Sequence, residues 1–241
     1  MAKNTAATDP AESTATDGRQ PTRRELRNRR QGAAVDAAFR LAGQEGAAGL
    51  TMRRLAQALD LDVTALYRLF RDKDELLLAL CERTIELALD EIGEIPDAEP
   101  WQDTVRRIAE ATWQVQTRFP GITALTFART TGGPAERRMV ELLLAAFTRS
   151  GLDPARAALF YRTFVDTALG LCAHAAALSA LNPEIRAKDD TTWSRVYARL
   201  PEADYPETRA HADALTAVGQ KAVYDTAVEA ILVATAQAAA I

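Results

Sequence analysis

The chain has 241 residues, of which 48% are hydrophobic and only 6% aromatic, enough for one compact domain and a smaller one. No long stretch alternates apolar and polar residues, so the composition excludes a β-rich fold and favours an all-α one. The net charge of −4 excludes a uniformly polycationic protein.

The charges are distributed unevenly along the chain. Residues 19–73 hold 12 Lys or Arg against 6 Asp or Glu, a local net charge of +6, so the remainder carries −10. A basic head on an acidic body is typical of a protein that docks one end on phosphates. We find no apolar run long enough for a bilayer and no signal peptide, and we therefore expect a cytoplasmic protein with no membrane partner.

The first 22 residues have almost no large apolar side chains, and we expect a disordered tail. The following segment, residues 23–30, carries five arginines. It leads into a helix whose apolar stripe, from Val35 to Ala42, ends near residues 43–46. The arginines are either a solvated helix start or an arm lying along the DNA backbone or in its minor groove.

Residues 51–73, TMRRLAQALDLDVTALYRLFRDK, carry the strongest motif. Apolar residues recur at helical spacing before and after a break at residues 59–61, which predicts two short packed helices joined by a turn. Thr51, Asp62 and Asp72 stand where N-caps are expected, and Glu75 follows Asp72 at capping-box spacing. The motif therefore predicts three helix starts and a helix-turn-helix.

This pattern resembles the tetracycline repressor (TetR) family of bacterial transcription regulators. The residues that carry the resemblance are Thr51, Leu55-Ala56, Leu66-Tyr67, Phe70, Lys73 and Leu76. The family usually places Gly in the turn, where this chain has Asp60. Asp tolerates a positive φ better than most residues, so we expect slight strain at this turn.

A helix-turn-helix presents its second helix to the major groove of double-stranded DNA. We expect Arg53, Thr64 and Arg68 to reach base edges, and Thr51, Tyr67 and Lys73 to hold phosphates. The alternative is an ordinary helical hairpin in a core, which the polar and basic surface disfavours. The full set of candidate DNA-binding residues is Thr51, Arg53, Arg54, Thr64, Ala65, Tyr67, Arg68 and Lys73.

The sequence divides into a helix-turn-helix domain at 23–71 and a linker helix with an effector-binding and dimerisation domain at 72–241. Beyond a Gly/Pro connection at 93–100, the pattern predicts helices over 101–119, 121–128, 134–150, 154–181 and 217–240. The polar composition of residues 182–216 predicts a long, partly mobile connection with one or two short helices, one of them near 208–215. From residue 101 onward the succession of helices is similar to the tetracycline-repressor subclass of ligand-binding domains.

Polar and aromatic side chains on otherwise apolar helices mark a candidate effector pocket. Each has an ordinary explanation on its own: Trp113 suits a core, Arg162 can pair with Asp166, and His174 suits an interface. We expect about half of the set to contact a small organic effector, aromatic or polycyclic. The candidates are Trp113, Gln116, Phe127, Arg129, Tyr161, Arg162, Val165, Asp166 and His174, with Trp193 as a further member.

The resemblance raises the question of a metal, because in tetracycline repressor itself histidine and acidic groups help hold a metal-bound drug. The aligned positions here are Thr126, Arg129 and Thr130, so we expect no metal and no other cofactor. Cys81 and Cys172 lack metal-ligand spacing and suit buried positions, although a redox pair stays open.

The sequence indicates a ligand-responsive repressor that binds an inverted-repeat operator as a homodimer and is released by its effector. The Ala-rich helices at 154–181 and 217–240 suit a four-helix interface between two copies, although they also suit the core of a monomer. One alternative is a dimeric small-molecule-binding protein that does not read DNA. Another is a helical enzyme using His174, but no catalytic motif supports one.

Overall fold

The computed structural model describes residues 22–240. Throughout this part of the chain the elements are α-helices and one 3-10 turn, without strands, which confirms the all-α prediction. The tail predicted for residues 1–22 lies outside the described residues except for Thr22. This threonine caps the first helix by a capping box with Glu25, a start signal that the sequence reading missed.

The N-terminal helices pack on one apolar core. α1 (Arg23–Gly49), α2 (Met52–Ala58) and α3 (Val63–Leu69) contribute Ala38, Leu55 and Leu66 to it, all completely buried. α4 (Lys73–Ile92) adds Leu76 and Leu80 from its first turns. The head core therefore extends beyond residue 71 into the helix that leads to the body.

The five arginines at residues 23–30 form the first turns of α1, the helix start that the sequence left open as one alternative, because the Thr22 capping box starts the helix before them. One expectation for α1 needs correction. The helix continues past residues 43–46 to Gly49, across a kink at Gly46, whose φ of 69° interrupts the helical conformation.

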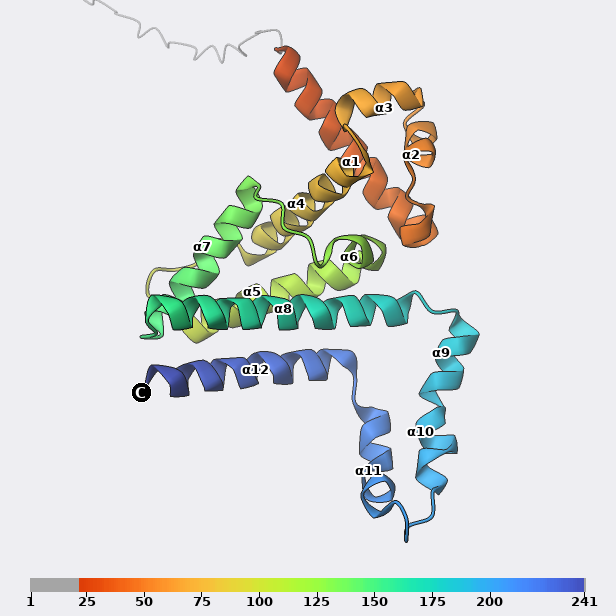
Figure 1. Ribbon diagram of the computed structural model, residues 1–241, viewed down its shortest axis with the longest axis vertical. Coiled ribbons are helices and arrows are strands. Elements are labelled where there is room, and N and C mark those ends of the chain that lie inside the picture. The colour runs from red at the N-terminus through yellow and green to blue at the C-terminus, as the bar shows by residue number, and fades with distance from the viewer. Residues whose placement is uncertain (1–21, 241) are drawn as a thin grey trace, which may run out of the picture.

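The body contains α5 (Trp101–Arg118), α6 (Pro120–Thr126), α7 (Pro134–Arg149), α8 (Pro154–Ser179) and α12 (Gln220–Ala239), close to their predicted bounds. Figure 1 shows α8 and α12 lying side by side below α4 to α7, and the two are packed together. Phe147 and Tyr224 are among the largest fully buried side chains. The Tyr224 hydroxyl donates to the Ala109 carbonyl at 2.9 Å, which anchors α12 on α5.

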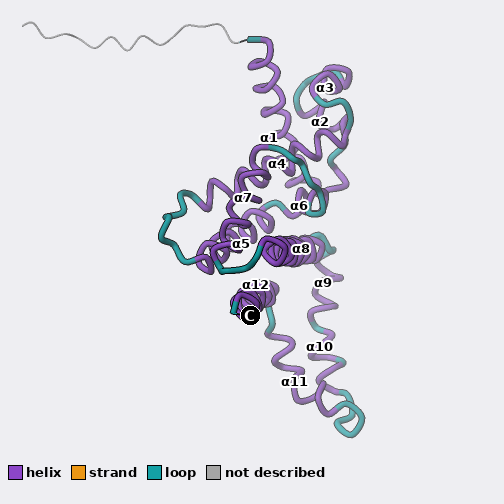
Figure 2. The backbone as a smooth tube through the Cα atoms, turned by 60° about the vertical axis from the view of Figure 1, so that its left-hand side comes forward, coloured by secondary structure: helices purple, strands orange, loops and turns teal. Residues whose placement is uncertain are grey.

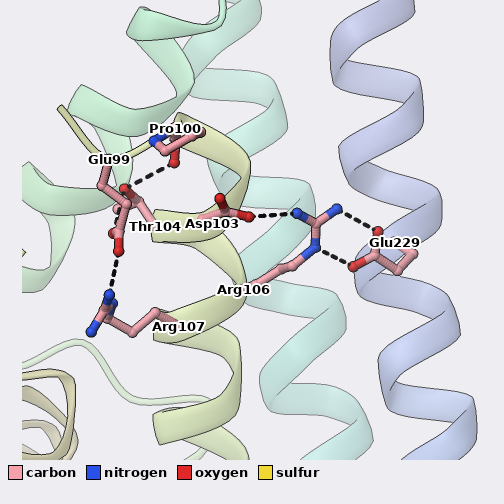
Figure 3. A network of polar contacts seen from close by, with 7 residues as sticks. All are labelled: Glu99, Pro100, Asp103, Thr104, Arg106, Arg107 and Glu229. Atoms are coloured by element: carbon pink, nitrogen blue, oxygen red, sulfur yellow. Dashed lines mark hydrogen bonds and ion pairs between the residues drawn. The ribbon is translucent and has the colours of Figure 1, made fainter.

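A polar network fixes the same two helices at the surface (Figure 3). Arg106 of α5 donates from Nε and Nη2 to the Glu229 carboxylate of α12, at 2.6 and 2.8 Å, and from Nη1 to Asp103 at 2.8 Å. These hydrogen bonds lower the pKa of Glu229. The bidentate contact sets how α12 rotates against α5 and thus which face of α12 stays exposed.

The excursion between α8 and α12 is more regular than predicted. It consists of α9 (Pro183–Asp190), α10 (Thr192–Arg195), the 3-10 turn η1 (Tyr197–Arg199) and α11 (Pro206–Ala217). Figures 1 and 2 show these elements extending away from the body as an arm. Trp193 packs on Tyr197 within the arm, with ring centroids 4.4 Å apart.

Over residues 22–240, no helix on its own combines the length and apolar composition needed to cross a membrane. Only α8 and α9 together reach that threshold, and they bend by 113° at their junction.

Candidate DNA interface and effector cavity

Each helix of the candidate DNA interface starts at the predicted cap. The Thr51 hydroxyl accepts a hydrogen bond from the Arg54 amide at 3.2 Å, and the Asp62 carboxylate accepts one from the Thr64 amide at 2.7 Å. Hydrogen bonding to the side chain and the amide of Thr64 lowers the pKa of Asp62. The three predicted starts are thus confirmed. At Asp72 the capping box differs from the usual pattern, because the Glu75 side chain accepts a hydrogen bond from the amide of Arg71 and not from the amide of Asp72.

The turn between α2 and α3 is closed by a C-terminal capping motif. The Leu61 amide donates to the Ala56 carbonyl at 2.9 Å, and the Asp60 amide to Gln57 at 3.1 Å, the Schellman pattern. Asp60 has a φ of 52°, and no other non-glycine residue in the described part of the chain has a positive φ. The left-handed position expected for this residue is therefore confirmed.

Five of the candidate DNA-binding side chains are exposed. Thr64, Tyr67 and Arg68 are exposed along α3, and Arg53 lies exposed on α2. Lys73, the first residue of α4, is exposed as well. Within residues 22–240, Arg53, Arg68 and Lys73 make no ion pair, so their charges face solvent.

The remaining candidates are less available. Arg54 is engaged by Glu45 near the end of α1, through an Nη2–Oε1 contact and an Nε–Oε2 contact of 3.2 Å. It therefore ties α2 to α1 in this structure, and its predicted contact with DNA stays a prediction. Ala65 is half-buried, and the Thr51 hydroxyl already accepts its capping bond.

One residue that orients α3 was missed at the sequence level. The Gln31 side-chain amide donates to the Leu69 carbonyl at 2.7 Å, which satisfies the C-terminal end of α3 from α1. A lone Gln in a basic helix gives no pattern that would single it out.

The body encloses a cavity of about 500 Å³. Its wall is mostly apolar, with Ile108, Met139 and Phe164 from α5, α7 and α8. Another part of the wall comes from α4, through Cys81 and Thr84, and from the segment that follows α6. A mostly apolar wall around a volume of this size suits a small organic molecule.

The cavity brings together most of the candidate ligand residues and excludes others. Trp113 instead packs on Tyr224, with centroids 4.8 Å apart, and belongs to the core. His174 is exposed on the far part of α8, and Trp193 lies in the arm. Trp113, His174 and Trp193 therefore do not line the cavity, contrary to the sequence prediction. Those that line the cavity are Gln116, Phe127, Arg129, Tyr161, Arg162, Val165 and Asp166.

Most polar groups around the cavity are already paired. Arg162 donates to Asp166 at 2.8 Å across one turn of α8, and both side chains are largely exposed. Gln116 accepts from the Thr123 hydroxyl at 2.6 Å. Tyr161 is half-buried with a raised pKa, mainly because of its burial, so its phenol stays protonated at neutral pH. Such a phenol can donate to a ligand oxygen.

Both cysteines occupy buried positions, as the sequence predicts. Cys81 and Cys172 are both buried and free. Burial raises the pKa of the Cys81 thiol to about 11 and that of Cys172 to about 12. Among the described residues there is no group of His, Cys, Asp and Glu that could hold a metal ion.

The segment Phe127–Thr130 lines the cavity and is also clamped to α4. Arg129 donates from Nη1 and Nη2 to Asp74, at 2.6 and 3.0 Å, in the first turn of α4. This contact lowers the pKa of Asp74. Next to it, the Thr131 hydroxyl donates to Glu82 of α4 at 2.6 Å.

The other end of α6 belongs to the head. Ile122 is buried in the head core, and Phe119 meets Phe39 of α1 edge-on with ring centroids 5.0 Å apart. At Gly121, a Cβ would lie only 2.6 Å from the Ala42 carbonyl oxygen of α1. The short helix α6 thus connects the cavity wall directly to α1.

The comparisons with known proteins agree with this architecture. The family model for bacterial regulatory proteins of the tetR family matches residues 34–80. The HTH-type transcriptional repressor DrrR1 of Streptomyces coeruleorubidus is 29% identical over 138 residues, 57% of this chain, and the match spans half the length of that relative.

Solved structures share the whole fold. A TetR transcriptional regulator from Streptomyces coelicolor is 26% identical with a TM-score of 0.68, over 85% of this chain and 96% of that one. ActR of the same organism, in complex with actinorhodin, has a TM-score of 0.72 at 23% identity, over 87% and 97% of the two chains. The head motif, the described helices and these matches agree: residues 34–80 match the model of the tetR family of bacterial regulatory proteins, and the fold is similar to that of solved TetR regulators.

Proposed function

We propose that this protein is a homodimeric transcriptional repressor that binds an inverted-repeat operator in double-stranded DNA and leaves it when a small organic effector binds. The observation that carries the proposal is α6, because one end lies in the head core and the segment after the other end lines the cavity. A regulator needs such a connection between its two sites.

DNA binding is supported by the exposed polar and basic side chains of α2, α3 and the start of α4. Arg53, Thr64 and Arg68 are the candidates for base edges, while Thr51, Tyr67 and Lys73 are those for phosphates. The relative DrrR1 is itself named a transcriptional repressor.

Effector binding is supported by the cavity. Its volume lies within the range of pockets that hold drug-sized ligands. Tyr161 supplies a protonated hydroxyl, and Phe127 and Val165 supply apolar wall. The solved complex of ActR with actinorhodin makes an aromatic polycyclic compound the first effector class to test.

Dimerisation is supported by the outward faces of α8 and α12. Leu159, Val223 and Val233 are exposed there, at 63%, 38% and 55%. Small residues such as Ala230 and Ala234 surround them, and a small-residue face allows two helix pairs to pack closely. The arm of α9–α11 also exposes Ile185 and Val218, which a second copy would cover.

Release of the DNA would proceed through the elements that the cavity and the head share. An effector that spreads α5, α7 and the segment after α6 would displace α6 on α1 and the Arg129–Asp74 clamp on α4. The two recognition helices of the dimer would then no longer match successive major grooves. By thermodynamic linkage, operator DNA must weaken effector binding by the same factor.

The experiment is a selection of duplexes from a random library with the full-length protein, followed by fluorescence anisotropy on the enriched sequence. We expect a two-fold symmetric site, and release of the labelled duplex by an aromatic polycycle, with actinorhodin as the first probe. Failure to enrich any sequence would contradict the repressor and favour a ligand-binding protein that does not read DNA. Enrichment without release by a panel of such compounds would contradict the effector class.

A further inference from the structure

We propose that the effector of this protein is an aromatic compound with a cationic amine, and that Glu136 of α7 binds this amine in the cavity. The inference rests on the proposed function, because it assumes that the cavity holds an effector, and it narrows the effector to one class. It also gives Glu136 a role in specificity that the pattern of the sequence does not indicate.

The first observation is the balance of charges in the cavity wall. Four charged side chains line the cavity, and three of them have an oppositely charged partner. Arg162 is paired with Asp166 on α8, and Arg129 donates both of its terminal nitrogens to Asp74 of α4. Glu136 is the fourth, and within residues 22–240 it makes no ion pair. The wall therefore presents one uncompensated charge, which is negative.

The second observation is that one oxygen of this carboxylate is available. The Oε2 atom of Glu136 accepts from the amides of Thr131 and Gly132, at 3.0 and 2.5 Å, just before α7 begins. The Oε1 atom has no such partner in the described part of the chain, where every fully buried side-chain oxygen has one. Oε1 is therefore accessible. Because Glu136 lines the cavity, this oxygen can accept a hydrogen bond from a bound molecule.

The third observation is that the charge of Glu136 acts on both sides of the cavity. Burial is the main cause of the raised pKa of Cys81 on α4 and of Tyr161 on α8, and the charge of Glu136 is the next cause for both. A negative charge has this effect because it disfavours a second negative charge nearby. Between mostly apolar walls the same field stabilises a cation more strongly than it would in water.

An anionic effector would meet unfavourable contacts in this cavity. It could pair with Arg129 only if Asp74 lost its two hydrogen bonds, or with Arg162 only if Asp166 lost its partner. Either exchange leaves a carboxylate without its cation, and Glu136 would repel the anion as well. A cationic amine requires no exchange of partners. The expected order of affinity is therefore cation, neutral compound, anion.

Glu136 is also connected to the helix that leads to the head. Thr131, whose amide donates to Glu136, donates its hydroxyl to Glu82 of α4 at 2.6 Å. Two residues earlier, Arg129 holds the same segment to the first turn of α4. An amine that binds the Glu136 carboxylate therefore competes for bonds that position this segment on α4.

The test uses three compounds with the same ring system and substituents of different charge. 9-Aminomethylanthracene is cationic at neutral pH, 9-hydroxymethylanthracene is neutral, and anthracene-9-carboxylate is anionic. Their binding to the full-length protein without DNA is measured by fluorescence anisotropy, for the wild type, Glu136→Gln and Glu141→Gln. Glu141 is the matched control because it is an exposed glutamate on the same helix that does not line the cavity.

We expect the wild type and Glu141→Gln to bind the amine at least about 10-fold more tightly than the alcohol, because hydrogen bonds between charged groups are the strong ones. The carboxylate should bind most weakly. Glu136→Gln should bind the amine and the alcohol about equally, with the affinity for the alcohol unchanged, since Gln keeps an acceptor oxygen but not the charge. Unchanged binding of the alcohol also verifies that the cavity of this variant is intact.

A preference for the amine that persists in Glu136→Gln would overturn the assignment of Glu136. Tighter binding of the carboxylate by the wild type would overturn the cationic class. If Glu136→Gln lost the alcohol and the amine to the same extent, Glu136 would only support the cavity wall, and the inference would fail.

Failure of the proposed function gives a different result from failure of this inference. If the wild type bound none of the three compounds, an aromatic effector in this cavity would be contradicted and the inference would fall with it. Equal affinity of the wild type for all three would overturn only the inference, and the cavity would remain a site for aromatic compounds.

Discussion

Asp60 is the residue at which this head departs from the glycine expected in the turn. Its φ of 52° lies in the left-handed region, where a Cβ is unfavourable and Gly is not. We predict that Asp60→Gly raises the free energy of unfolding by roughly 0.5–1 kcal/mol. Urea denaturation measures it. Asp60→Ala, which keeps a Cβ, should be no more stable than the wild type, and a less stable Gly variant would show that the Asp60 carboxylate stabilises the turn.

Arg53 and Lys73 separate base reading from phosphate binding at the level of single residues. Both are exposed, but Arg53 lies within α2, whereas Lys73 is the first residue of α4. We predict that Lys73→Ala weakens all duplexes equally and reduces the salt slope by about 1. Arg53→Ala should relax the preference at one position per half-site, at about 1–3 kcal/mol. Selection on the variants measures both, and identical specificity profiles would contradict the assignment.

At the scale of elements, the crossing of α6 and α1 depends on a glycine. A Cβ at Gly121 would lie 2.6 Å from the Ala42 carbonyl oxygen, a backbone atom that cannot move aside alone. We predict that Gly121→Ala lowers the free energy of unfolding by about 1–3 kcal/mol, as overpacking does. Gly32→Ala in α1 is the control, because no atom lies within 4 Å of its Cβ and Ala is the better helix former. Equal stability of both variants would mean that α6 is not tightly seated.

The ion pair between Arg129 and Asp74 gives a test of coupling between the cavity and the head. Arg129 lines the cavity, whereas Asp74 does not. If the pair transmits the effector signal, Arg129→Met and Asp74→Asn should shift the effector concentration for release by a similar factor. Allosteric couplings of about 5–150-fold set the scale. Operator titrations with increasing effector measure the shift. A shift in Arg129→Met alone would show that Arg129 acts only by touching the ligand, and no shift in either would exclude both roles.

Elements with a local signal were predictable from the sequence, and tertiary contacts were not. Thr51, Asp62 and Asp72 start helices through bonds to residues two or three positions away, so their spacing is visible in the chain. The Arg54–Glu45 pair and the packing of Trp113 on Tyr224 depend on how helices cross. Nothing in the spacing of these residues distinguishes a pocket wall from a core.

The region between α8 and α12 and the start of α1 were only partly predictable. The short helix expected near residues 208–215 is present as α11, but α9, α10 and η1 form in addition, around contacts such as Trp193 on Tyr197. At α1, the clustered arginines left a helix start and an arm open, and the Thr22–Glu25 capping box makes the segment helical. In both places specific contacts decide what local composition leaves open.

At the scale of the whole molecule, the proposed dimer sets the spacing of the two heads. The outward face of α12 holds Ala230 and Ala234, both exposed in one protomer. A Glu at position 230 would place an unpaired charge in a close-packed helical interface, which is strongly unfavourable. We therefore predict that Ala230→Glu converts a dimer of twice 26.2 kDa into monomers of 26.2 kDa in light scattering at micromolar concentration.

The same variant should lose affinity for the inverted repeat by more than about 100-fold, because each head then binds its half-site alone and the gain from linking two sites disappears. Ala33→Glu, at an exposed position on α1, is the control for the oligomeric state and should remain dimeric. Loss of dimers with full operator affinity would contradict the two-fold arrangement of the heads. A dimeric Ala230→Glu variant would contradict the four-helix interface, and the exposed apolar residues Ile185 and Val218 would then be the ones to mutate next.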